Sequence, residues 1–384
     1  MPIHEIIAKS LLIRHRRAES WFVCRYGMNI FRGCGHNCIY CDGRAEKYNV
    51  GGEFGVDISV KTNACELLEK EIDPARHRKP LDRGFFFFGG GVGDAYQPAE
   101  EKYSLARRIL QIIHEHGFPV HVLTKSTLVS RDMDMLKQIN AKTRAMVSMS
   151  FSSVDRDLSA FLEPGVSEPR LRLQALASFK NQGIPTGMFL MPVVPGLSDT
   201  EKKITESVAA AKEAGLDFVI FGGLTLKEGR QKDFFMERLA TRYPDTAVKY
   251  PVIFHGNKYG STLPAYYNKI AARFAQAALK FRMPVRIPRK FWEDMVSPLD
   301  KLCIMFEHMD YMAMLGGPKS GGPRSPYGYA SYMLSKVKNA VDRVDAADFA
   351  GIPSFSATVQ EAAREIAETG TCGLYEELVF RYSR

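Results

Sequence analysis

The chain has 384 residues, and its 52 lysines and arginines against 43 aspartates and glutamates give a formal charge of +9. Hydrophobic residues make up 45% of it, an ordinary globular composition that excludes a disordered, collagen-like or low-complexity chain. No apolar run approaches the ~20 residues of a membrane span, and the N-terminus lacks an apolar signal core, so we expect no membrane segment or export signal.

Short apolar runs alternate along the first two-thirds of the chain with stretches of helical periodicity. Continuous apolar runs of this length are typical of strands that are buried on both faces of a parallel sheet. The predicted strands are 21–26, 84–88, 120–124, 145–150, 186–191 and 217–221, with a seventh candidate at 248–254. The predicted helices are 64–72, 100–116, 131–140, 168–182, 200–214 and 231–243.

Helix boundaries support this alternation. Gly117, Gly183 and Gly215 stand just past three of the predicted helices, where a residue with positive φ ends a helix at little cost. Asp199-Thr200-Glu201 is a typical helix start. The pattern predicts right-handed βαβ units in an α/β fold, a partial (β/α)6-type barrel with its site at the C-terminal ends of the strands. We predict a lead-in at 1–20, the barrel at 21–264 and a mainly helical extension at 265–384.

The cysteines are the most informative feature of the chain. There are seven, an odd number that argues against a disulfide framework, and Cys34, Cys38 and Cys41 fall within eight residues as C-x3-C-x2-C. Three thiolates on one tight loop can hold three corners of a [4Fe–4S] cluster and leave the fourth iron open. Zinc is the alternative, but a structural zinc needs four ligands, and His36 is the only nitrogen ligand close by.

This spacing, with Tyr40 directly before the last cysteine, resembles the radical S-adenosylmethionine (SAM) superfamily. Other stretches resemble its spore photoproduct lyase-like branch, which is related to DNA repair photolyases. They are 29–34, 60–64, 93–98, 124–126, 162–164 and 192–197. The resemblance covers about residues 21–199. It implies that the three cysteines ligate a [4Fe–4S] cluster and that the open iron chelates SAM.

The resemblance also implies an activity. Reductive cleavage of SAM would yield a 5′-deoxyadenosyl radical that abstracts a hydrogen atom from the substrate, with the barrel positioning and shielding the reaction. The electron would come from a ferredoxin- or flavodoxin-type donor. An oxygen-sensitive cluster would place the protein in a reducing cytoplasm.

Four side chains would contact SAM by the same resemblance. Tyr40 would lie beside the adenine, and Lys125, after the third strand, would meet the carboxylate. Ser148 would bond the ribose or the carboxylate, and Met191 would line the adenine pocket. Tyr40 also has an ordinary interpretation as a packed aromatic, and Ser148 and Met191 have one as core residues.

The turn after the second strand carries Gly89, Gly90 and Gly91, which resemble the family motif whose backbone carbonyl meets the SAM amino group. Glycine permits such a close approach of the main chain to a ligand; a flexible turn is the alternative. Photoproduct lyase has a hydrogen-donating cysteine near this turn, and its absence here argues against literal photoproduct lyase activity. Cys303, in a methionine-rich helical stretch, is a candidate replacement as hydrogen donor.

Together these features favour a radical SAM enzyme, of lyase or transferase type, that acts on a nucleic-acid base or lesion. Basic residues concentrate at 14–17, 76–83 and 280–290, where they would suit a phosphate backbone or lie on an ordinary solvated surface. One alternative keeps the chemistry and changes the substrate to a peptide, protein or small metabolite. The other is a non-catalytic, metal-stabilised nucleic-acid-binding protein. The sequence leaves the oligomeric state open.

Overall fold

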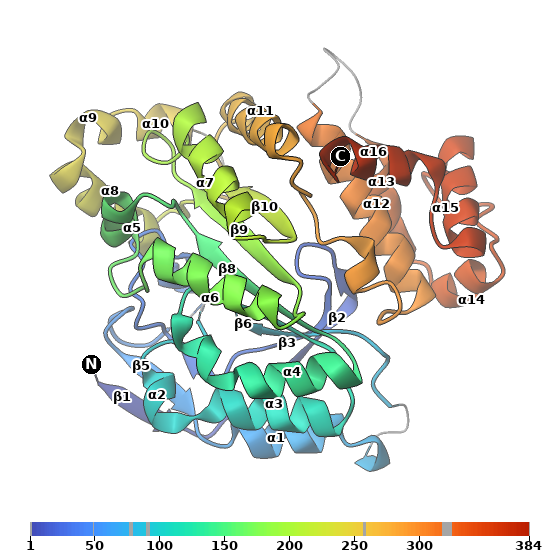
Figure 1. Cartoon of the computed structure of the whole chain (residues 1–384), viewed down its shortest axis with the longest axis horizontal. Coiled ribbons are helices and arrows are strands. Elements are labelled where there is room, and N and C mark those ends of the chain that lie inside the picture. Colours follow the sequence, from blue (N-terminus) through green and yellow to red (C-terminus); the bar gives the residue numbers. More distant parts are fainter. Residues whose placement is uncertain are drawn as a thin grey trace.

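The computed structural model describes residues 2–48, 50–76, 80–89, 93–255, 259–316 and 325–383. Its main sheet curls into a half-barrel with the strand order β10-β9-β8-β7-β6-β3-β2 (Figure 1). The strands are β2 (Leu12–Glu19), β3 (Cys24–Met28), β6 (Phe86–Gly89), β7 (Val120–Thr124), β8 (Ala145–Phe151), β9 (Thr186–Val193) and β10 (Phe218–Gly223). The six strands from β3 to β10 are parallel and β2 is antiparallel to β3, which confirms the predicted partial barrel.

Helices cover the outer face of the sheet, each with its apolar stripe turned inward (Figure 1). In α3 (Leu105–Glu115), for example, Ile109 and Ile113 are buried while Arg108 and Gln111 face solvent. The other helices of the barrel are α1 (Ala64–Ile72), α2 (Ala99–Tyr103), α4 (Met133–Lys142), α5 (Arg156–Leu162), α6 (Pro169–Asn181), α7 (Glu201–Glu213), α8 (Arg230–Arg242) and α11 (Pro264–Phe281). The three glycines predicted to end helices all have positive φ, and the side chain of Thr200 caps α7.

Two predicted elements differ from the structure. The candidate strand at 248–254 is wrong: the segment follows the short helix α9 (Pro244–Ala247) and contains a turn and the short helix α10 (Tyr250–Ile253). Pro251 lacks the backbone donor that a strand ladder needs, whereas the first turn of a helix tolerates it. The helix predicted at 100–116 is divided by Ser104, whose φ of 49° is left-handed, and the buried Glu100 carboxylate accepts the amide N–H groups of Leu105 and Ala106 that follow the break.

The N-terminal segment adds strands that the sequence pattern did not indicate. Besides β2 in the main sheet, β1 (Ile3–Ile6) pairs with β5 (Ile58–Lys61), which in turn pairs with β4 (Phe31–Arg32). This small sheet fixes β4, whose last residue lies two positions before Cys34. The cluster loop therefore starts from a backbone held on one side by a sheet.

Helices α12 (Pro298–Leu315), α13 (Pro326–Leu334), α14 (Ala340–Asp345), α15 (Ala357–Thr369) and α16 (Gly373–Ser383) form the C-terminal region beside β2 (Figure 1). Helix α12 contacts both edges of the half-barrel. Near its start, Asp300 accepts the Ala18 N–H at 2.7 Å on the β2 side; near its end, the Tyr311 hydroxyl donates to the Phe221 carbonyl of β10 at 3.2 Å. The helix thus lies across the gap between the two edge strands. Over the described residues, no helix has the length and apolarity needed to span a bilayer.

Candidate active site

The cluster loop, residues 33–41, is anchored by its backbone. Gln97 donates to the Gly33 carbonyl at 3.2 Å and accepts the Gly35 N–H at 2.7 Å. Gly33 has a φ of +78°, and a Cβ there would lie 2.6 Å from the Asp57 carbonyl oxygen, so only glycine fits. The Gln97 amide bonds the loop backbone on both sides of Cys34, as a neighbouring strand would, and thereby fixes the position of this cysteine.

His36 ties the loop to the segments that follow β6 and α5. Its Nε2 lies 3.1 Å from the Asp94 carboxylate and its Nδ1 lies 2.9 Å from the Gly165 carbonyl. Asp94 also accepts the Thr124 hydroxyl at 2.7 Å and the Lys125 N–H at 2.8 Å. One buried carboxylate therefore sets the loop against the end of β7. With both ring nitrogens within hydrogen-bond distance of oxygen atoms, His36 has a structural role in holding the loop.

Arg44 holds the loop through hydrogen bonds to its backbone. This residue was not identified as a site residue from the sequence. Its guanidinium donates to the Cys38 carbonyl at 3.3 Å, to the Phe54 carbonyl at 3.2 Å and to Asn37, and it lies 3.6 Å from the ring centre of Phe234. A planar group with several fixed donors suits this task, because it holds several carbonyl oxygens at once. Its signal in the sequence is only a basic residue three positions after the last cysteine.

The three cysteines are free and lie near one another. Cys34 and Cys38 are buried, and the half-buried Cys41 packs against the apolar groups around both. Burial raises the pKa of the Cys38 thiol to about 12, and the charge of Lys125 acts in the opposite direction. Such thiols become thiolates when a cationic metal centre compensates their charge.

The donor set fits a [4Fe–4S] cluster better than a zinc ion. Among the residues with described positions, no three His, Cys, Asp or Glu side chains converge as ligands of a single metal ion. A tetrahedral zinc site requires such convergence. A cubane cluster binds each thiolate through a different iron, so its three ligands stand apart.

A buried ion network lies next to the loop. The Lys125 ammonium donates to Ser150 at 2.8 Å and to Glu163 at 2.9 Å, and it lies 5.6 Å from the ring centre of Tyr40. Glu163 also accepts the Tyr40 hydroxyl and, at 2.9 Å, the Arg172 guanidinium. The structure thus brings together Tyr40 and Lys125, both predicted from the sequence to contact SAM. It adds Ser150 and Arg172, which the sequence did not single out, and Glu163, which lies in the resembling stretch 162–164.

The side chains of Ser148 and Met191 take no part in that network, which reaches Met191 only through its backbone carbonyl. Ser148 is fully buried deeper in the barrel, where its hydroxyl lies 2.9 Å from His121 Nε2. Met191 is half-buried at the end of β9; its carbonyl accepts the Ser150 hydroxyl at 2.8 Å, and its side chain lies against Gly222 of β10. Their roles toward SAM stay predictions.

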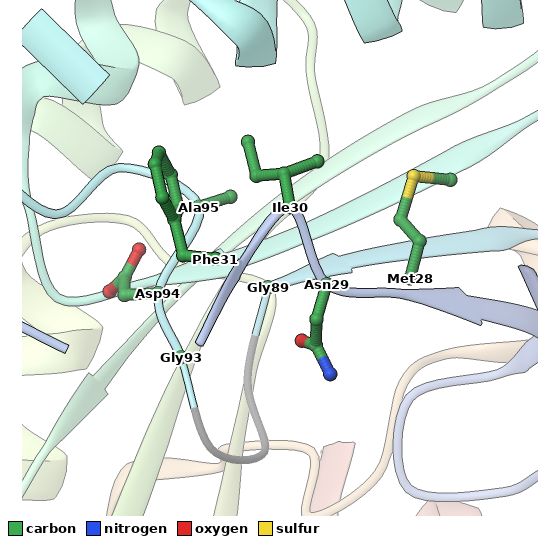
Figure 2. A pocket seen from close by; sticks show the side chains of 8 residues that line it. All are labelled: Met28, Asn29, Ile30, Phe31, Gly89, Gly93, Asp94 and Ala95. Atoms are coloured by element: carbon green, nitrogen blue, oxygen red, sulfur yellow. The ribbon is translucent and has the colours of Figure 1, made fainter. Parts of the chain in front are cut away.

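Gly89 ends β6 with a φ of +118°, and a Cβ there would lie 1.9 Å from the Leu123 carbonyl oxygen. Gly90 and Gly91 lie outside the described residues. Figure 2 shows the residues around a narrow hollow beside Gly89, where the Asn29 side chain points to the opposite side of the backbone from Met28 and Ile30. Its empty volume is about 170 Å³, and it is too narrow to hold a ligand by itself.

Cys303 lies in α12 and is fully buried. Its carbonyl accepts the Ser331 hydroxyl of α13 at 3.2 Å, and burial raises the pKa of its thiol to about 12. These surroundings are those of a packed core thiol. The hydrogen-donor role of Cys303 stays a prediction.

Comparisons with known proteins agree with this geometry. The family model described as Radical SAM superfamily matches residues 28–208, from the end of β3 into α7. An uncharacterized protein of Mycobacterium tuberculosis is 29% identical over 287 residues, which are 74% of this chain and 82% of that protein. An uncharacterized protein of Methanocaldococcus jannaschii is 30% identical over 224 residues, 58% of this chain and 78% of that protein.

Among solved structures, a spore photoproduct lyase variant with bound AdoMet and dinucleoside spore photoproduct superposes with a TM-score of 0.51. The match covers 73% of this chain and 79% of that protein at 16% sequence identity. At this identity the likeness establishes a shared fold.

Proposed function

Since the chain belongs to the radical SAM superfamily, we propose that it acts on a base or a base lesion in nucleic acid. Family membership confirms the predicted enzyme class and the predicted cofactors, a [4Fe–4S] cluster and SAM. The substrate proposal rests on one observation: the fold is shared with a lyase that holds a dinucleoside lesion. Whether the reaction is of lyase or transferase type is left open.

We assign the chain's residues to two tasks. Cys34, Cys38 and Cys41 would hold the cluster, and Lys125, with its ammonium already oriented by two hydrogen bonds, would hold the SAM carboxylate. When bound, the cluster and SAM supply a radical that abstracts hydrogen from the substrate. Tyr40 would lie at the adenine, as its position beside Lys125 favours.

Ser148, Met191 and the glycines from Gly89 to Gly91 keep the roles toward SAM that the family resemblance implies. For the hydroxyl role, the position of Ser150 beside the Lys125 ammonium favours Ser150 over Ser148. Ser148→Ala and Ser150→Ala, compared by SAM affinity, separate the two.

Surface charge gives the nucleic-acid proposal limited support. On β2, Arg14 and Arg16 are exposed, where they could meet phosphates, although Arg14 also donates to the Glu71 carbonyl at 3.5 Å. The segment at 280–290 is not a continuous basic surface, because Arg286 is buried and Arg289 is paired with Glu293 at 2.9 Å. The segment at 76–83 lies partly outside the described residues.

The enzyme requires a reducing electron donor, for which we propose a ferredoxin or flavodoxin in the cytoplasm. For the final hydrogen transfer we keep Cys303 as a candidate. If Cys303 donates hydrogen to the product radical, Cys303→Ala changes the product distribution without loss of the fold. An unchanged distribution removes that role.

The substrate proposal is tested with the full chain reconstituted anaerobically with iron and sulfide. Ultraviolet-irradiated DNA, untreated DNA, RNA and a peptide mixture are each added with SAM and dithionite, and 5′-deoxyadenosine is measured. We expect nucleic acid to raise its formation well above the rate without substrate, and deuterium from labelled bases to enter it. Stimulation by peptides alone, or by none of these, contradicts the proposal.

A further inference from the structure

Arg286 lies in the seam between the last barrel strand and the C-terminal helices. It follows α11, in a segment that runs along the free edge of β10, where the Val219 N–H donates to the Pro284 carbonyl at 2.8 Å. Only 6% of the residue is exposed. Its guanidinium lies between two aromatic rings, 4.3 Å from the ring centre of Trp21 and 3.5 Å from that of Tyr311.

The guanidinium has no hydrogen bond to any described residue. Nε and Nη1 are enclosed and without a partner, whereas Nη2 is not among the enclosed atoms. A buried, unpaired charge is costly, and most buried polar groups in native proteins are hydrogen-bonded. The two rings make cation–π contacts with the faces of the guanidinium, and its N–H groups are left without acceptors.

Within the described part of the chain, no carboxylate forms an ion pair with Arg286. The Glu19 carboxylate accepts the Trp21 and Phe22 N–H groups at 3.0 and 3.2 Å, and both it and Asp310 act on Arg286 only at longer range. Burial, and next the charge of Arg286, lower the pKa of His308 to about 3, so this imidazole is neutral. Burial likewise lowers the pKa of Arg286 itself.

The seam adjoins the end of the barrel at which substrates bind in this architecture. The ring of Tyr267 lies against Gly223, the last residue of β10; a Cβ on that glycine would be 3.2 Å from the ring. Trp21, Tyr267 and Gly223 are all half-buried, as is Met191 on the next strand. Solvent therefore reaches the side chains around the guanidinium although the group itself is covered.

We propose that Arg286 is the anion-binding residue of the substrate site and that it receives a phosphodiester of the substrate. An oxyanion that reaches Nη2 lies on the side of the guanidinium to which the enclosed Nε–H bond also points, because these two N–H bonds are parallel. Stacking between Trp21 and Tyr311 holds the guanidinium, and with it these two N–H bonds, in a fixed orientation before the substrate arrives. The choice of a phosphodiester rests on the proposed function, since a substrate carboxylate would accept hydrogen bonds from the same two N–H groups.

Trp21 provides a direct readout of binding. The chain has two tryptophans, so Trp292→Phe leaves Trp21 as the only indole, in contact with the guanidinium. The reconstituted variant is titrated with thymidylyl-(3′→5′)-thymidine, with uncharged thymidine and with N-acetylglycine as the carboxylate. We expect the dinucleotide to change Trp21 fluorescence and thymidine to change it little. Calorimetry on the otherwise unmodified chain checks the affinity if Trp292→Phe impairs folding.

Arg286→Met separates binding from stability. We expect it to weaken dinucleotide binding by at least about tenfold, the effect of losing a hydrogen bond to a charged group. We expect it to unfold at the same denaturant concentration as the wild type or higher, since an apolar side chain of similar volume replaces a buried unpaired charge. Arg289→Lys, a matched change at an arginine with an ion-pair partner, should leave the affinity unchanged.

Unchanged dinucleotide binding in Arg286→Met overturns the proposal, and so does a large loss of stability, which would make the guanidinium a structural link between Trp21 and Tyr311. Failure of the proposed function is a separate result. If Arg286→Met abolishes anion binding but no nucleic acid raises 5′-deoxyadenosine formation, Arg286 stands as an anion site and the nucleic-acid substrate falls. Tighter binding of N-acetylglycine than of the dinucleotide likewise keeps Arg286 as an anion site and contradicts a nucleic-acid substrate. If Arg286→Met turns over nucleic acid at the wild-type rate, the role of Arg286 is wrong and the nucleic-acid substrate still stands.

Discussion

Glu163→Gln should be among the most damaging isosteric changes in the barrel. The Glu163 side chain is fully buried and accepts hydrogen bonds from two cations, Lys125 and Arg172, each at 2.9 Å. Glutamine keeps the shape but removes the negative charge, so one of its two terminal atoms donates where it must accept. The two cations would then share a buried space without their counter-ion.

The expected loss follows from these two bonds. Hydrogen bonds to charged groups contribute about 1.5–3 kcal/mol each. Removing one partner of a buried ion pair costs about 3–5 kcal/mol. We therefore expect the free energy of unfolding to fall by about 3–5 kcal/mol and, because Lys125 loses an anchor, SAM affinity to fall as well.

The pH dependence gives a second check. Burial alone would raise the pKa of Glu163, but Lys125, Arg172 and the Tyr40 hydroxyl outweigh it and hold the pKa well below its usual range. A carboxylate with a lowered pKa stabilises the fold above its unfolded value, near about 4.3. The difference between wild type and Glu163→Gln should thus be constant from pH 8 to about 5 and shrink as the pH falls below about 4.

The assay is urea unfolding followed by circular dichroism, combined with calorimetric titration of SAM. Glu100→Gln is the matched control, since Glu100 is equally buried and bonded to Arg131 at 2.7 Å but lies away from Lys125. It should destabilise the fold and leave SAM affinity unchanged. Glu168→Gln, at an exposed ion pair, should cost less than about 1 kcal/mol. If Glu163→Gln is no more harmful than Glu168→Gln, the reasoning is refuted.

Three further changes test other parts of the site. Cys38→Ala should abolish the brown [4Fe–4S] absorption after reconstitution and with it SAM cleavage, whereas Cys65→Ala, at a lone buried cysteine, should keep both. Gly89→Ala should cost more than about 3 kcal/mol in urea unfolding, because its Cβ would lie 1.9 Å from a carbonyl oxygen of the next strand, while Gly183→Ala, with nothing within 4 Å, should cost about 1–2 kcal/mol. Ser150→Ala removes one of the two hydrogen bonds of the site lysine and should weaken SAM binding several-fold; equal affinity would count against this placement.

Much of the fold follows from local sequence pattern. Apolar runs between amphipathic stretches predict strands and helices because burial on both faces of a parallel sheet and on one face of a helix leaves those periods in the chain. The pattern failed at 248–254, where apolar content suggested a strand and Pro251 prevented it. It also missed β1 and β2, because β2 is rich in arginine and half-exposed, so it lacks a continuous apolar run.

The sequence by itself determined the chemistry of the cluster: three closely spaced thiols are a local feature, and their spacing fixes what they can ligate wherever the loop lies. The family resemblance also predicted Tyr40 and Lys125 as SAM contacts, and these roles stay predictions. Only the tertiary structure decided that Glu163 and Arg172, more than thirty residues after Lys125, complete its ion network. Likewise, only the fold buries Arg286 between Trp21 and Tyr311. Such contacts join distant segments through the curvature of the sheet and the crossing of α12, and no local pattern records them.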